Sequence, residues 1–141
     1  MCLYTIQTKT RIAKKDIYVY KVLRQFKGSY INGLLSPFQD FPYDVGELVT
    51  ANIGELNQNG FRLRGNVRKT LTTDIVYEVE EGLHSYLNLH KAQELIVKKF
   101  EMTGIVFDAI IPKGSEYICS YNGEITSNQL IVLKEHQFLP V

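Results

Sequence analysis

The chain has 141 residues, of which 45% are hydrophobic and 22% are charged, as is typical of a globular protein with one buried core. Two cysteines are too few for the disulfide framework of small secreted proteins, and no apolar segment is long enough to cross a membrane. We therefore expect one globular domain over residues 1–141, located in the cytoplasm. Its formal net charge of +1 excludes a strongly basic or strongly acidic protein.

That small net charge is unevenly distributed. Residues 1–30 contain seven Lys and Arg against one Asp, a net charge of +6, whereas residues 31–60 contain four acidic and no basic residues, a net charge of −4. The two segments either neutralise each other within the fold, or the basic one attracts an acidic partner.

The first expected strand covers residues 16–23, where β-branched and aromatic residues place odd-numbered and even-numbered side chains on opposite faces. From Gly28 to Gly46, glycine and proline interrupt a run of aromatic residues, which predicts an ordered loop whose rings pack inward. Short strands are expected near residues 47–52 and 60–67.

Residues 61–68 alternate strictly, so their arginines share one face of a strand. On the next expected strand, residues 74–81, Asp74, Glu78 and Glu80 share a face at the same period. If the two strands are neighbours, the arginine row opposes the carboxylates in cross-strand ion pairs. The alternative is that Arg62 and Arg64 bind an anionic ligand.

One helix is predicted over residues 89–100, because Leu89, Ala92, Ile96 and Phe100 recur at helical spacing. Asn88 or Ser85 can provide its N-terminal cap.

The strongest local signal is Asn122-Gly123, which follows residues 105–118 and precedes the apolar run 129–133. Asn-Gly between apolar runs predicts a β-hairpin, here over residues 116–133. The order of elements predicts an α+β fold that is mainly antiparallel sheet, with one principal helix (about 89–100) and a C-terminal β-hairpin.

No motif for catalysis, metal binding or phosphate binding is present. The three histidines lack ligand spacing, and neither a phosphate-binding loop nor a dinucleotide-binding glycine pattern occurs, so we predict no metal and no cofactor. His84 lies where a strand is expected to pass into the helix, a junction that can bind a ligand, although a local hydrogen bond is the simpler role. We expect Cys119 to be a core or interstrand residue.

The candidate ligand-binding residues lie at expected turns, at the ends of expected elements and on the arginine row. None of them is assigned a catalytic role. These residues are His84, Ser85, Tyr86, Tyr43, Arg62, Arg64 and Glu124. The basic segment from Lys9 to Lys27 is in addition a possible nucleic-acid contact.

Six segments resemble a group of small uncharacterised proteins from gut bacteria and their phages. They are residues 1–5 (MCLYT), 15–17 (KDI), 20–23 (YKVL), 36–38 (SPF), 82–86 (GLHSY) and 111–117 (IPKGSEY). This resemblance spans nearly the whole chain and implies a role in the biology of mobile elements.

A second resemblance is to the ADP-ribosyltransferase superfamily. Residues 82–86 (GLHSY), then Ala92, then residues 109–112 (AIIP) are similar in order to that superfamily's strand, helix and strand, and Glu124 stands at its late acidic position. The Arg or His on the first strand of such enzymes has no counterpart in residues 18–21 (YVYK). The resemblance implies NAD binding near His84, Tyr86 and Glu124.

Three functional hypotheses follow. The first is a non-enzymatic accessory binding protein of phage or prophage type that acts on a host protein or a small anionic ligand. The alternative is a degenerate ADP-ribosyltransferase-like enzyme or an NAD- or nucleotide-binding protein, and the third is a nucleic-acid-binding protein. The oligomeric state is left open.

Overall fold

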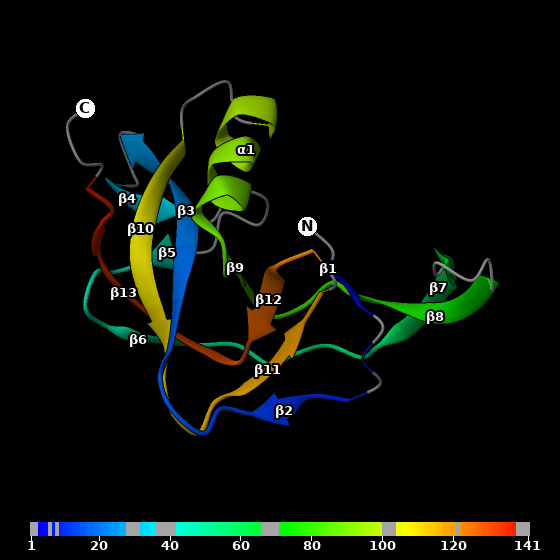
Figure 1. Cartoon of the computed structure of the whole chain (residues 1–141). Coiled ribbons are helices and arrows are strands. Elements are labelled where there is room, and N and C mark those ends of the chain that lie inside the picture. Colours follow the sequence, from blue (N-terminus) through cyan, green and yellow to red (C-terminus); the bar gives the residue numbers. More distant parts are fainter. Residues whose placement is uncertain are drawn as a thin grey trace.

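The computed structural model describes residues 3–5, 7, 9–27, 32–35, 42–65, 71–99, 104–120 and 122–137. Within these ranges the chain forms thirteen strands and one helix (Figure 1). They are β1 (Leu3–Thr5), β2 (Arg11–Ile12), β3 (Ile17–Lys27), β4 (Asn32–Leu35), β5 (Pro42–Tyr43), β6 (Leu48–Thr50), β7 (Asn57–Gly65), β8 (Leu71–Val79), β9 (Leu83–Tyr86), α1 (Leu89–Lys99), β10 (Gly104–Ile111), β11 (Glu116–Cys119), β12 (Glu124–Ser127) and β13 (Gln129–Glu135).

The strands form two antiparallel sheets. The larger sheet has the order β2-β11-β12-β9-β3-β10-β13-β6, and β4 joins it beside β3 with β5 beyond. The smaller sheet has the order β1-β8-β7, and its β7–β8 ribbon extends away from the rest of the molecule (Figure 1). The predicted dominance of antiparallel sheet is confirmed, and α1 is the only helix in the described part of the chain. None of the described helical residues forms a span suited to crossing a membrane.

The main core lies on one face of the larger sheet. Alternation along β3 turns Val19 and Leu23 toward this face, where they pack with Leu83 of β9 and Val132 of β13. Tyr43 of β5 is buried in the same cluster. The aromatic segment from Gly28 to Gly46 thus includes two short strands that the sequence did not predict, and its residues 28–31 and 36–41 lie outside the described part.

Helix α1 covers part of the opposite face. Its Ala92 is fully buried and packs against Val22 of β3 and Val106 of β10. The helix begins after Asn88, whose Oδ1 accepts a hydrogen bond of 2.7 Å from the backbone N–H of His90. Asn88 is therefore the cap, while Ser85, the other expected cap, lies within β9.

The C-terminal hairpin is present, but the expected second strand is wrong. β11 pairs with β12, and the chain reverses between Ser120 and Glu124 with Gly123 at φ 93°. The apolar run expected to complete the hairpin belongs to β13, which pairs instead with β10 and β6. Asn128 separates β12 from β13, and its side-chain Oδ1 accepts a hydrogen bond from the N–H of Glu116.

The expected ion ladder between β7 and β8 is confirmed in register at one position only. Arg62 lies opposite Asp74, but Arg64 lies opposite Thr72, and Glu78 lies opposite Asn57. The two strands run antiparallel, so residues that follow Arg62 lie opposite residues that precede Asp74, on the side away from Glu78 and Glu80. A register shift in β7 between Gln58 and Phe61 then places Asn57 opposite Glu78. The third expected arginine, at position 68, lies outside the described residues.

Candidate functional site

Three of the candidate residues share one face of two neighbouring strands. Glu124 of β12 lies opposite Tyr86 of β9, and Thr126 lies opposite His84 two residues along. Because side chains two apart on a strand point the same way, His84, Tyr86 and Glu124 lie on the same face. Ser85 points to the opposite face, toward the main core.

Both ring nitrogens of His84 are already engaged. Nδ1 lies 2.9 Å from the hydroxyl oxygen of Thr126, and Nε2 lies 3.1 Å from the backbone carbonyl oxygen of Glu80. Burial lowers the pKa of His84 to about 4, so the ring is neutral at pH 7. His84 thus links β9 to β12 and to the end of β8, in agreement with the local structural role considered from the sequence.

Glu124 and Tyr86 form a partly buried pair of acidic groups. Burial raises the pKa of the half-buried Glu124 carboxyl, and the charge of Lys91 on α1 acts in the opposite direction. The pKa of Tyr86 is also raised, first by burial and then by the charge of Glu124. Glu124 is therefore partly buried, although it directly follows the Asn122-Gly123 turn.

A buried lysine lies on the core face behind these residues. Lys21 of β3 is 4% exposed, and its Nζ donates a hydrogen bond of 2.5 Å to the backbone carbonyl oxygen of His84. The same Nζ lies 5.0 Å from the ring centroid of Tyr43. Burial lowers the pKa of Lys21 to about 7, so at neutral pH its amine is divided between the charged and neutral forms.

Ser85 is a second buried polar group on this face. It is fully buried, and its hydroxyl has no hydrogen-bond partner in the described part of the chain. The extended register of Tyr20 with Tyr86 places Lys21 across from Ser85. The basic N-terminal surface considered for nucleic acid therefore loses Lys21, although Arg11, Lys14 and Lys15 are exposed.

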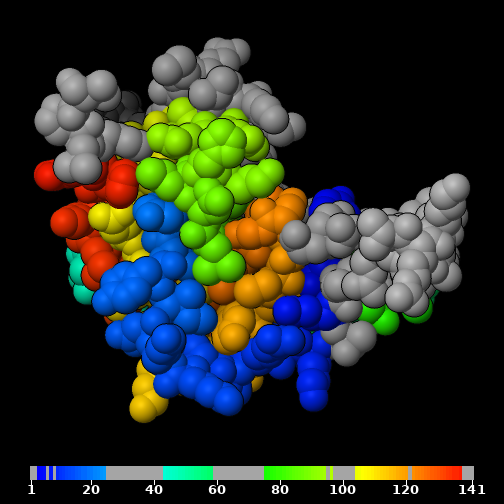
Figure 2. Space-filling model, viewed as in Figure 1, coloured from blue at the N-terminus to red at the C-terminus, as the bar shows by residue number. Residues whose placement is uncertain are grey.

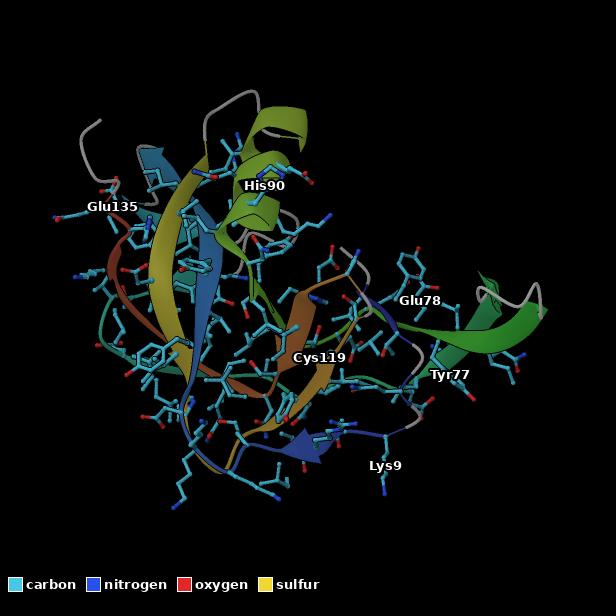
Figure 3. The ribbon with its side chains drawn as sticks, viewed as in Figure 1. Lys9, Tyr77, Glu78, His90, Cys119 and Glu135 are labelled. Atoms are coloured by element: carbon cyan, nitrogen blue, oxygen red, sulfur yellow. The ribbon has the colours of Figure 1, made fainter. Side chains whose placement is uncertain are left out.

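The seven candidate residues do not form one site. His84, Tyr86 and Glu124 share a face, Tyr43 contacts Lys21 on the other face, and Arg62 and Arg64 belong to β7 in the smaller sheet. The described residues include no group of three His, Cys, Asp or Glu side chains that could hold a metal ion. Cys119 is partly buried on β11, where burial raises the pKa of its thiol (Figure 3).

Beyond α1, the same face of the larger sheet carries four apolar residues on four adjacent strands. Ile110 of β10 lies opposite Tyr18 of β3 on one side and Ile131 of β13 on the other, and Ile131 lies opposite Leu48 of β6. We call these four residues the apolar row. Tyr18 is 76% exposed and Leu48 is 52% exposed, while the two isoleucines between them are half-buried.

The apolar row is bordered by polar residues on both sides. Between the row and α1, Asp108 lies opposite Lys134 and its Oδ1 is 2.7 Å from His136 Nδ1. The His136 ring in turn meets Tyr20 edge to face, with centroids 5.5 Å apart. On the far side, Gln129 lies opposite Thr50. In Figure 2 the blue atoms of β3 lie uncovered below the yellow-green atoms of α1.

Sequence reasoning missed both Lys21 and the apolar row. The alternation of Val19, Lys21 and Leu23 was only a partial signal for Lys21, because it places the lysine on one face with two apolar residues. The row could not be seen locally, since its four members come from four strands.

Comparisons with known proteins add no relative. No family model matches the chain, no curated protein matches it, and no solved structure matches its fold.

Proposed function

We propose that the chain is a non-enzymatic binding protein of phage or prophage type that recognises a host protein through the apolar row. The observation that carries the proposal is the exposure of Tyr18 and Leu48 at the two ends of an in-register apolar surface. Apolar surface bordered by polar residues is the usual composition of a protein–protein contact.

The magnitude of the effect supports the choice of this surface. Covering a large apolar side chain contributes about 1.5–3 kcal/mol. Tyr18 is mostly exposed, so its burial in a complex would contribute about 2 kcal/mol, or roughly a thirty-fold change in affinity.

The test compares two exposed apolar residues. Tyr18→Asp should weaken capture of the partner from a host cell extract by thirty-fold or more, because the variant places a charge in the contact. Ile12→Asp is the matched control, since Ile12 is 56% exposed but lies on β2 at the opposite edge of the larger sheet. Equal capture by the two variants, or capture by Tyr18→Asp at the wild-type level, would exclude the row as the binding surface.

A second candidate function is an NAD-binding protein related to the ADP-ribosyltransferases. The observation in its favour is the shared face of His84, Tyr86 and Glu124, which the resemblance requires. The engagement of both His84 nitrogens favours the first proposal, because neither nitrogen is left to bind a ligand. Isothermal titration with NAD decides the matter: binding that Glu124→Gln abolishes would support the second candidate, and no binding would remove it.

A further inference from the structure

We infer that the occupant of the apolar row is an amphipathic α-helix of the partner, lying along the row and across the four strands. This inference rests on the proposed function. It follows from two features of the surface: the spacing of the row and its small area.

The spacing of the row matches a helix. Its four residues sit on adjacent strands, so neighbouring members are about 4.8 Å apart and the ends are separated by about 14 Å. A helix presents apolar residues at i, i+3, i+7 and i+10, a mean rise of about 5 Å between anchors. An extended peptide presents one side chain to the surface every two residues, which is about 6.6 Å. Its side chains therefore do not match the spacing of the row.

The small area of the row favours a short segment of the partner over a broad folded surface of the partner. Only four side chains make the row, and two of them are already half-buried. Each partner in a standard protein–protein interface contributes about 800 Å², which is far more than four such side chains expose. A second copy of this chain, facing the row with its own row, would bury too little apolar surface to form a stable dimer.

The row borders the surface that α1 covers. Helix α1 packs on Val22 and Val106, and Tyr20, two residues from Tyr18 on the same strand, packs against that cluster. Tyr20 and Tyr18 are about 6.6 Å apart along β3. The partner helix would lie on the same face as α1, with Asp108 and Lys134 between them.

Two photoreactive probes test this inference by measuring a spacing. Benzoylphenylalanine is introduced in place of Tyr18 in one protein and in place of Leu48 in another, and each is cross-linked in host cell extract. Mass spectrometry then identifies the attached residues of the partner. The same probe in place of Ile12 is the control and should not attach to that segment.

A helix along the row predicts attachment points about ten residues apart in one partner segment, because about 14 Å divided by about 1.5 Å per residue gives that number. A separation of about four residues indicates an extended segment and overturns the inference. Attachment to a second copy of this chain, or to two unrelated segments, also overturns it.

The failure of this inference differs from a failure of the proposed function. If Tyr18→Asp abolishes capture but the attachment points lie about four residues apart, the row is the binding surface and its occupant is not a helix. If neither probe captures a partner, both proposals are wrong. A peptide of the attached segment should bind the full chain, and a proline at the centre of that peptide should weaken binding at least ten-fold.

Discussion

Replacement of Lys21 by methionine should change how the stability of the protein depends on pH. Lys21 has a pKa of about 7 in the folded chain, against 10.5 in the absence of burial. Between these two pH values the unfolded chain holds a proton that the folded chain has released. The free energy of unfolding should therefore rise with pH from about 7 to about 10, by up to about 1.4 kcal/mol per pH unit.

The total effect follows from the difference between the two pKa values, about 3.5 units. At about 1.36 kcal/mol per unit, this difference corresponds to about 5 kcal/mol. Below pH 7 the burial of Lys21 lowers the free energy of unfolding by this full amount. Methionine has a similar length and no charge, so Lys21→Met should be more stable than the wild type at pH 6 by several kcal/mol. The two proteins should approach equal stability near pH 10.

Urea unfolding at pH 6, 7, 8, 9 and 10 measures this difference. Lys14→Met is the matched control, because Lys14 is exposed and its substitution should leave the pH dependence unchanged. The series stops at pH 10 because burial also raises the pKa values of Tyr43 and Tyr86, which lowers stability at higher pH. If the free energy of unfolding rises with pH equally steeply in the wild type and in Lys21→Met, Lys21 does not have a lowered pKa in the folded chain.

Three further predictions concern residues that hold the fold together. The pKa of His84 is about 4 in the folded chain against 6.5 for a solvated histidine, so the free energy of unfolding should fall by about 3 kcal/mol as the pH drops from 6.5 to 4. His84→Gln should remove most of this pH dependence in urea unfolding. An unchanged pH dependence would contradict the burial of His84. Gly82→Ala should lower the unfolding free energy by about 1–3 kcal/mol more than Gly46→Ala. Both glycines have positive φ, but of the two only position 82 would bring the new Cβ into collision with Thr126 Cγ2. Equal losses on thermal unfolding would disprove this contact. Asn88→Ala should lower stability by about 1 kcal/mol through loss of the helix cap, with the exposed Asn52→Ala as a control that shows no loss.

The sequence predicted those elements that depend only on residues close together in the chain. The alternation of β3, the helical spacing of Leu89, Ala92 and Ile96, and a capping residue before α1 all depend on residues within one turn or one strand. The side chains of His90 and Glu94 on the outer side of α1 lie 2.9 Å apart, as their spacing of four residues predicts.

Register and strand choice could not be predicted in the same way. Two strands follow the Asn122-Gly123 turn, and nothing local shows that β12 pairs with β11 whereas the apolar β13 pairs with β10. The apolar row depends on the register of Tyr18 with Ile110, two residues far apart in the chain. Lys21 looked like part of a basic surface because alternation shows that two faces exist, but not which one becomes the core.

The central claim is that the four residues of the apolar row act together as one binding surface. Quantitative mass spectrometry of proteins captured from host cell extract tests it with three variants: Tyr18→Asp, Leu48→Asp and Ile12→Asp. Tyr18 and Leu48 lie at the two ends of the row on different strands, whereas Ile12 lies at the opposite edge of the sheet. We expect the same protein to be lost with both row variants and retained with Ile12→Asp. Retention of that protein by either row variant would contradict the claim.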